Sequence, residues 1–187
     1  MEMYTLEELK SIVANCKKCP LCLRRTNVVF GQGNPKGDIL FVGEGPGYYE
    51  DQMGLAFVGP AGQLLTKAIE GIGYTRDEVY IANIVKCRPP NNRIPLKEEV
   101  NACIPYLRWQ VKIIQPKIIM CLGAVAATNI IDPNFKITQE RGKWYERKGI
   151  WIMATYHPSA VLRDALKKRP FWEDFKKLKE KHEEIKG

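Results

Sequence analysis

The chain of 187 residues has no uninterrupted apolar stretch that approaches the roughly 20 residues needed to cross a bilayer. It also has no internal repeat, low-complexity tract or linker, and residues 1–10 do not show the pattern of a signal peptide. With 45% hydrophobic and 27% charged residues, the composition is that of a globular protein able to bury a continuous core. We therefore expect one domain over residues 1–187, cytoplasmic and not associated with a membrane.

Negative charge is comparatively scarce, because 21 acidic residues stand against 29 lysines and arginines and leave a formal charge of +8. A basic surface can bind a polyanion such as nucleic acid, since neutralised phosphates release their counterions. Much of the charge can equally be an ordinary solvated helix face, because lysines and glutamates are interleaved over residues 176–184. Charge alone therefore leaves both interpretations open.

Two common phosphate-binding motifs are missing. Residues 43–47 read Gly-Glu-Gly-Pro-Gly, which has neither the G-x-G-x-x-G spacing of a dinucleotide site nor the Gly-Lys-Ser/Thr ending of a P-loop. Glycines placed directly after a strand still allow the backbone to approach a ligand closely, and its N–H groups can meet an anion or a carbonyl. A simple tight turn is the alternative interpretation of this segment.

Strand and helix patterns alternate along the chain. Short apolar runs predict buried parallel strands over residues 38–43, 79–85, 118–122 and 149–155. Apolar residues at helical spacing predict helices over residues 6–13, 61–72, 96–115 and 171–185, with a kink at Pro105 and a short helix after Gly123. This alternation predicts an α/β fold, with helices on both faces of an open parallel sheet.

Ligands of such sheets bind beyond the carboxyl ends of the strands. That edge should hold the glycine-rich loop 43–47, residues 83–93, Gly123 and residues 156–163. His157, one of only two histidines, follows the last predicted strand. A lone histidine is usually structural, but one at the ligand edge is well placed to donate a hydrogen bond. Phe57 lies between glycines, where a phenylalanine is normally part of the core unless the ligand is planar.

The cysteines carry the most specific pattern in the chain. Cys16 and Cys19 form a C-x2-C pair, and 15 residues separate Cys87 from Cys103. Four thiolates at one centre fit either a structural zinc ion or a [4Fe–4S] cluster. In the cytoplasm, such cysteines more often bind metal than form disulfides. Cys22 extends the first pair to C-x2-C-x2-C, and the spacing does not settle its role.

Four further motifs follow one another along the chain: Gly43-Glu44-Gly45-Pro46-Gly47 with Glu50-Asp51, Phe57-Val58-Gly59, NIVKCRPPNNR over residues 83–93, and His157-Pro158-Ser159. Together with the cysteine pairs, they resemble the family 4 uracil-DNA glycosylases, the iron–sulfur branch of that superfamily, over nearly the whole chain. The resemblance implies a three-layer α/β/α sandwich around a central four-stranded parallel sheet. It also implies a DNA repair enzyme that flips uracil out of DNA and hydrolyses its N-glycosidic bond, leaving an abasic site and free uracil.

The implied cofactor is a [4Fe–4S] cluster. The resemblance assigns it to Cys16, Cys19, Cys87 and Cys103 and leaves out Cys22 and Cys121. Cys121 lies inside an apolar strand, where we expect a small core residue. The cluster would be structural, because it would brace the basic loop after Cys87 and take no part in bond cleavage.

The resemblance also implies roles for three side chains in the base pocket. Phe57 would stack on the flipped uracil, and Asn83 would pair with the polar edge at N3 and O4. His157 would donate a hydrogen bond to O2, where negative charge develops as the base leaves. Asn83 would also discriminate against cytosine, whose 4-amino group is a donor where uracil offers an acceptor.

The backbone of Gly43 and Gly45 would line this pocket. Superfamily members with the motif G-Q-D-P-Y place a water-orienting aspartate where this chain has Gly45, so we take Glu44 as the substitute. With Asn83 and His157, Glu44 completes the predicted catalytic set. Glu50 is our candidate for the residue that excludes the thymine methyl group. The tyrosines at positions 48 and 49 depart from the family, in which glutamates are common.

The DNA-binding surface is predicted on both sides of the pocket. Wedge residues for the space that the flipped nucleotide vacates are expected in the segment that begins at Ser159, namely Val161, Leu162 and Arg163. Phosphate or DNA contacts are expected from Lys86, Arg88, Asn92 and Arg93. The implied partner is uracil-containing DNA, single- or double-stranded. A sliding clamp is a candidate protein partner, and we expect a monomer.

Functions of other classes make different predictions. A zinc-stapled nucleic-acid module without catalysis would be colourless and contain one zinc ion. An electron carrier would show rapid reversible reduction and would tolerate alanine at Asn83 or His157. A bifunctional lyase needs an amine nucleophile, and no lysine stands out in the pocket motifs. We therefore expect an abasic site as the product and no strand cleavage.

Overall fold

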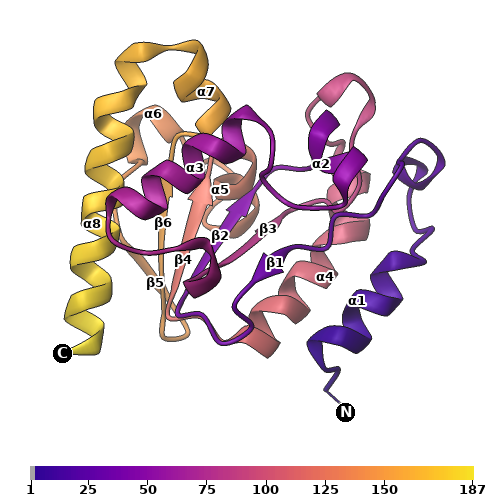
Figure 1. Ribbon diagram of the computed structural model, residues 1–187, viewed down its shortest axis with the longest axis horizontal. Coiled ribbons are helices and arrows are strands. Elements are labelled where there is room, and N and C mark those ends of the chain that lie inside the picture. Colours follow the sequence, from indigo (N-terminus) through magenta and orange to yellow (C-terminus); the bar gives the residue numbers. More distant parts are fainter. Residues whose placement is uncertain (1–2) are drawn as a thin grey trace.

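The structure is a computed structural model that describes residues 3–187, so residues 1 and 2 of the predicted domain lie outside the described residues (Figure 1). A six-stranded sheet forms its central layer in the order β1-β3-β2-β4-β6-β5. The strands are β1 (Gln32–Gly33), β2 (Ile39–Gly43), β3 (Tyr80–Asn83), β4 (Ile118–Leu122), β5 (Tyr145–Arg147) and β6 (Ile150–Thr155). The neighbours β3, β2, β4 and β6 pair in parallel, whereas β1 and β5 are antiparallel edge strands.

The four predicted parallel strands are confirmed, and the prediction of a four-stranded sheet missed the two edge strands. Short edge strands give little sequence signal, because one side of them is unpaired and open to solvent. Strand β1 has only two residues, and two of the three residues of β5 are exposed. The hairpin from β5 to β6 turns at Lys148 and Gly149, which both have the positive φ that a two-residue hairpin turn needs.

Helices cover both faces of the sheet. The α-helices are α1 (Leu6–Ala14), α2 (Tyr48–Met53), α3 (Pro60–Gly71), α4 (Lys97–Ile114), α5 (Ala124–Ile130), α6 (Ile137–Glu140), α7 (Pro158–Arg163) and α8 (Lys168–Lys186). The 3-10 turns are η1 (Pro20–Leu23), η2 (Arg76–Glu78), η3 (Pro90–Asn92) and η4 (Ala165–Lys167). Helices α2, α6 and α7 were not predicted, because they are too short for a helical period to be visible. Over residues 3–187, no helix combines the length and the apolar character needed to span a membrane.

Strand β2 shows how one segment serves both layers of helices. Its side chains alternate between the two faces of the sheet. Leu40 and Val42 join the core beneath α1, α4 and α5, whereas Ile39 and Phe41 join the core beneath α3, α7 and α8. Figure 1 shows α8 along one side of the sheet and α1 and α4 along the other. All five residues of β2 are buried, as its apolar run predicted.

The carboxyl ends of the parallel strands meet at one edge of the sheet, as predicted. Gly43 ends β2, Asn83 ends β3, and His157 follows β6 after one intervening residue. Gly123 follows β4 with a φ of +94°, in the left-handed region that favours glycine. A Cβ atom at Gly123 would lie 2.9 Å from the Cβ atom of His157. The glycine is therefore needed both for the turn and for the close approach of the histidine.

Candidate active site and cysteine centre

A cleft of about 420 Å³ opens at this edge of the sheet. Its walls come from the glycine-rich loop, α2, the ends of β3 and β6, η3 and α7. Most predicted site residues line it: Glu44, Gly45, Glu50, Phe57, Asn83, Asn92, Arg93, His157, Ser159 and Arg163. Segments that are far apart in the sequence therefore contribute to one cavity at the predicted place.

Asn83 supplies an unpaired hydrogen-bond acceptor to the floor of the cleft. Its side chain is buried, and its Oδ1 atom has no hydrogen-bond partner among residues 3–187. Buried polar atoms are nearly always paired, so an unpaired one at a ligand cleft indicates a group that a ligand completes. Gly43 lies directly beneath, and a Cβ atom there would come within 2.6 Å of Asn83 Oδ1 and would collide with the ring of Phe57. Gly43 thus makes room for both side chains.

The backbone of Phe57 is held in a conformation that is rare for a residue with a side chain. Its φ is +51°, in the left-handed region, and its ring is largely buried. Arg76 of η2 fastens this turn, because its Nη1 donates to the Phe57 carbonyl at 2.9 Å and its Nη2 to the Ala56 carbonyl at 2.8 Å. Gly62 of α3 touches the Phe57 backbone so closely that any side chain would collide with it. The sequence interpretation missed Arg76 and Gly62.

His157 caps the N-terminus of α7 and faces the ring of Phe57. The two ring centroids are 5.7 Å apart with an interplanar angle of 31°. Its Nδ1 accepts a hydrogen bond from the Ser159 backbone N–H at 3.1 Å, and the Ser159 hydroxyl lies 2.7 Å from the same atom. Burial and the nearby positive charge of Arg163 lower the pKa of His157 to about 4. The ring is therefore neutral at physiological pH, and because Nδ1 accepts, its proton lies on Nε2.

Two carboxylates line the cleft in different environments. Burial raises the pKa of Glu44 above its ordinary value, although the charge of Arg163 opposes this shift. Glu50 is already engaged, because its Oε1 accepts a hydrogen bond from the Gly59 N–H at 3.2 Å. Asp51 points away and accepts from the backbone N–H groups of Thr26 and Asn27. Of the three, Glu44 is the carboxylate without a structural hydrogen bond among the described residues.

The predicted wedge segment divides into buried and exposed residues. Val161 is only 1% exposed and packs in the core beneath α7, so the prediction that it contacts DNA is wrong. Leu162 is 52% exposed, and Arg163 lines the cleft. Leu162 is therefore the apolar side chain of the predicted wedge that remains exposed.

The basic residues of the 86–93 segment also differ from one another. Arg88 donates from Nε to Asn92 Oδ1 at 2.7 Å and remains at the surface. Arg93 forms a two-pronged ion pair with Glu99, with N–O distances of 2.9 and 2.7 Å. The charge of Arg93 is therefore partly neutralised within the protein, whereas we find no carboxylate partner for Arg88 among the described residues.

Lys86 does not point to solvent, and the prediction of a phosphate contact is wrong. The residue is 1% exposed. Its Nζ donates to the Asn83 carbonyl at 2.9 Å and to Gln110 Oε1 of α4 at 2.6 Å, and Gln110 donates in turn to the Phe30 carbonyl. Burial lowers the pKa of Lys86 to about 8. Lys86 is instead an internal brace behind the strand end that carries Asn83.

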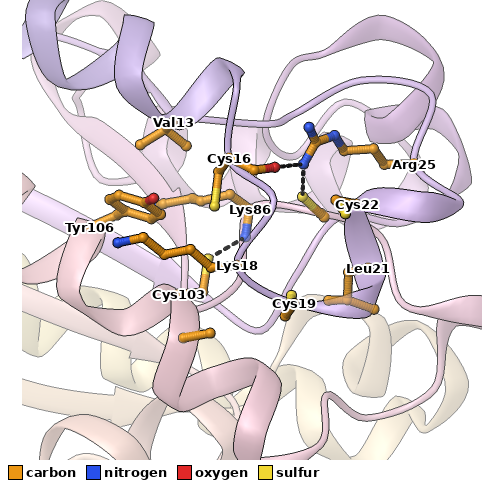
Figure 2. A pocket seen from close by; sticks show the side chains of 12 residues that line it. Val13, Cys16, Lys18, Cys19, Leu21, Cys22, Arg25, Lys86, Cys103 and Tyr106 are labelled. Atoms are coloured by element: carbon orange, nitrogen blue, oxygen red, sulfur yellow. Dashed lines mark hydrogen bonds between the residues drawn. The ribbon is translucent and has the colours of Figure 1, made fainter.

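The predicted cysteine ligands meet in a second, smaller cavity between α1, η1 and α4 (Figure 2). All four of Cys16, Cys19, Cys87 and Cys103 line it, and so does Cys22. Cys121 lies in β4 and is completely buried in the core, as predicted. Over residues 3–187, no three histidine, cysteine or acidic side chains gather tightly around one point as ligands of a single ion would.

Nitrogen donors already point at two of these sulfur atoms. Arg25 Nη1 lies 3.3 Å from Cys87 Sγ and also donates to the Cys16 carbonyl, and the Lys86 backbone N–H donates to Cys103 Sγ at 3.3 Å (Figure 2). Burial raises the pKa of Cys103 to about 11 and also raises that of Cys87. Thiols with such values need a metal centre to ionise, and N–H donors to sulfur are typical of the surroundings of iron–sulfur clusters. The residues therefore fit a thiolate-bound metal centre.

Comparison with known proteins agrees with the predicted fold and family. Residues 30–179 match the family model described as the uracil DNA glycosylase superfamily, which defines the class of the protein. The chain is 50% identical to the type-4 uracil-DNA glycosylase of Sulfurisphaera tokodaii, in an alignment that covers 95% of the chain and 85% of the relative. It is 47% identical to that of Thermotoga maritima and 45% identical to that of Archaeoglobus fulgidus, covering 96% and 94% of those relatives. The chain belongs to the type-4 uracil-DNA glycosylase family.

Proposed function

We propose that the protein is a DNA repair glycosylase that removes uracil from DNA by hydrolysis and leaves an abasic site. The observation that carries this proposal is the buried, unpaired Oδ1 of Asn83 at the floor of a cleft that also holds Phe57 and His157. Membership of the type-4 family supports it. The proposal includes a single-domain monomer in the cytoplasm that acts on single- or double-stranded DNA, with a sliding clamp as the candidate protein partner.

Asn83 explains how uracil would be distinguished from cytosine. Uracil presents a donor at N3 and an acceptor at O4, and the Asn83 amide can accept from the first with Oδ1 and donate to the second with Nδ2. Cytosine presents the opposite pattern, an acceptor at N3 and an amino donor at C4, and would leave the buried amide unsatisfied. Phe57, held by Arg76 and Gly62, would offer the face of its ring to the flipped base.

His157, as a neutral hydrogen-bond donor, and Glu44, as a negatively charged proton acceptor, would both assist bond cleavage. When the bond between C1′ and N1 breaks, its electron pair leaves with the base, and the negative charge is shared with O2. The neutral His157 can donate from Nε2 to that oxygen without having to lose a proton first. The oxygen of a water molecule bonds to C1′, and Glu44 orients the water and accepts its proton. The uracil anion is protonated after it leaves the site.

The cofactor proposed for the thiol cavity is a [4Fe–4S] cluster, with Cys16, Cys19, Cys87 and Cys103, which all line the cavity, as its ligands. When bound, the cluster would supply structural bracing and not redox chemistry, because it would fasten the 87–93 loop that forms one wall of the cleft. The hydrogen bonds from Arg25 and from the backbone of Lys86 would offset the negative charge of the thiolates. The side chains of the base pocket would then carry out recognition and catalysis.

The direct test is incubation of the protein with an oligonucleotide that contains one uracil. Free uracil measured by mass spectrometry, together with strand breaks that appear only after alkali, is the expected result. The same oligonucleotide with thymine in place of uracil is the control. Absence of free uracil from an iron-loaded preparation would contradict the proposed activity, and strand breaks before alkali would indicate a lyase.

Replacing Asn83 with aspartate should change base preference more than DNA affinity. A carboxyl group keeps the shape of the amide but loses the donor to O4, so uracil release should fall about 10- to 100-fold, in line with the roughly 1–3 kcal/mol that an unsatisfied buried polar group costs. Excision of cytosine relative to uracil should rise, because a carboxyl oxygen can accept from the 4-amino group. Steady-state rates of release of the two bases measure base preference, and binding to an abasic-site oligonucleotide measures DNA affinity. Equal losses in rate and affinity would refute the recognition role.

Replacing Lys86 with methionine should also impair catalysis, although Lys86 lies outside the cleft. Methionine fills similar space but cannot donate to the Asn83 carbonyl or to Gln110. We expect kcat/KM for uracil release to fall about 10-fold or more, since hydrogen bonds from a charged donor are each worth about 1.5–3 kcal/mol. The iron content should stay normal, because the backbone N–H still reaches Cys103 Sγ. Lys36→Met, on an exposed lysine, is the control, and unchanged kcat/KM in Lys86→Met would exclude the bracing role.

A further inference from the structure

Two large aromatic side chains are exposed at the mouth of the cleft without a structural reason. Tyr48 is 52% exposed and Tyr49 is 55% exposed, and both line the cleft from the first turn of α2. Exposed aromatic surface beside a ligand cleft is a common sign of an interaction site. Nothing in the proposed chemistry of base removal uses these two rings.

The two rings are held in a defined arrangement. They meet edge to face with their centroids 5.4 Å apart at an angle of 84°. The guanidinium of Arg88 lies over the Tyr48 ring at 5.4 Å, and Arg88 is itself held by its hydrogen bond to Asn92. A ring held by a cation and by a neighbouring aromatic group is preorganised for binding, because its side chain loses little conformational entropy when a planar ligand stacks on it.

The surroundings indicate what the planar ligand is. The cleft between the tyrosines and α7 is where the proposed function puts the flipped nucleotide, and Arg163 on its far wall adds positive charge to that of Arg88. A base that is joined to the flipped nucleotide by one phosphate has a planar face for the rings and a negative charge for the arginines. Aromatic side chains beside a basic groove are the usual means of binding single-stranded nucleic acid.

We propose that the Tyr48–Tyr49 pair forms a stacking platform for an unpaired base next to the flipped uracil, in which one ring stacks on the base and the perpendicular ring supports the first, so that the protein binds single-stranded DNA more tightly than duplex DNA. The inference rests on the proposed function, because it places the neighbouring nucleotide relative to the base cleft. In a duplex, that neighbouring base is paired and stacked on its own strand, and it cannot reach the rings. In a single strand it is free to do so.

The test compares DNA binding of the wild type with that of a Tyr48→Ala/Tyr49→Ala double variant. Fluorescence anisotropy with uracil-free DNA, single-stranded and as the matching duplex, measures affinity at one fixed salt concentration. Stacking on an aromatic side chain is worth about 5- to 150-fold in affinity per base, so single-strand affinity should fall by a factor in this range while duplex affinity stays unchanged. The double variant Tyr48→Phe/Tyr49→Phe keeps the rings and should bind as the wild type does. Met53→Ala, on an exposed residue of the same helix, is the matched control.

A second readout reports stacking directly. The fluorescent base 2-aminopurine, placed beside an uncleavable uracil analogue in a single strand, should be quenched by the wild type and by the phenylalanine variant, and not by the alanine variant. Thermal unfolding checks that the alanine variant is folded. Equal loss of single-strand and duplex affinity, or no loss at all, would overturn the platform. The anisotropy experiment uses DNA without uracil, so its outcome does not depend on catalysis. Failure to release uracil would contradict the proposed function, whereas the binding comparison would still test the platform.

Discussion

Replacing His157 with alanine is expected to lower kcat for uracil release by about 10²–10³-fold, with little change in DNA affinity. The imidazole is neutral, and its Nδ1 is occupied by the Ser159 backbone N–H, so its single proton faces the cleft from Nε2. Alanine removes the donor proposed to meet the charge that develops on O2. No other described histidine is near enough to replace it, since His182 lies beside Asp38 at the opposite edge of the sheet. Single-turnover rates with saturating enzyme isolate the chemical step.

The pH dependence distinguishes a neutral donor from a charged one. Because the pKa of His157 lies at about 4, this ring stays neutral near neutrality, and its protonation should lower kcat only as the pH approaches that value. A fall in kcat that begins at a higher pH is expected from protonation of Glu44, whose pKa is raised by burial. Protonation of His157 would place a proton on Nδ1, opposite the Ser159 N–H, and would add a charge beside Arg163. A rate that instead rises as the pH falls from 7 to 5 would mean that the charged ring is the active form, and the assignment would be wrong.

The same pKa affects stability. The folded value of about 4 is below the ordinary value of 6.5, so the unfolded chain binds more protons between these two values. The contribution of His157 to the free energy of unfolding is therefore complete above 6.5 and is lost as the pH falls toward 4. The thermal midpoint of the wild type should drop more steeply through this window than that of His157→Ala.

Replacing Cys87 with serine is expected to abolish the proposed [4Fe–4S] centre and, with it, most of the activity. Cys87 lies at the start of the loop that forms one wall of the cleft, and its sulfur is the one that Arg25 contacts. Without the centre, the guanidinium of Arg25 and the buried thiol groups are left without compensating partners. We expect loss of the brown colour and of bound iron, and a lower thermal midpoint, because each 1 kcal/mol of lost stability lowers the midpoint by about 2–4 °C in a chain of this size.

Cys22→Ser is the matched control for this experiment, because Cys22 lines the same cavity. It should retain iron and colour, as a residue outside the four ligands would. Loss of iron from Cys22→Ser with retention in Cys87→Ser would reverse the assignment. A colourless wild-type protein with one zinc ion would favour the zinc-stapled module. Rapid reversible reduction together with normal function in His157→Ala would favour an electron carrier.

Much of the site could be predicted because its residues follow strand ends. His157 follows the apolar run 149–155 closely, whereas Asn83 lies within the predicted run 79–85, because the strand ends at Asn83, two residues earlier than predicted. The carboxyl ends of parallel strands must meet at one edge. The two edge strands could not be predicted in the same way, because β1 and β5 are too short and too exposed to give an apolar pattern. The cysteine pairs predicted one centre, and the structure does bring these side chains to one cavity.

Other features depend on contacts that no local pattern encodes. Val161 and Leu162 are neighbours in the sequence, yet one is buried and the other exposed, because α7 packs one side against the core and turns the other to solvent. Lys86 stands in a basic loop motif, where a lysine normally reaches solvent. Its burial depends on Gln110, which is supplied by α4. Arg76 and Gly62 hold Phe57 from segments with no recognisable motif of their own.

By itself, the sequence determined the α/β architecture, the edge of the sheet that carries the cleft and most of the residues gathered there, because strand periodicity and strand-end motifs are local properties. Only the tertiary structure decided which side chains face the ligand and which hold those side chains in place from behind. That distinction depends on packing between distant segments: the helix that buries Lys86, the arginine that fastens Phe57 and the serine N–H that leaves the proton of His157 on Nε2.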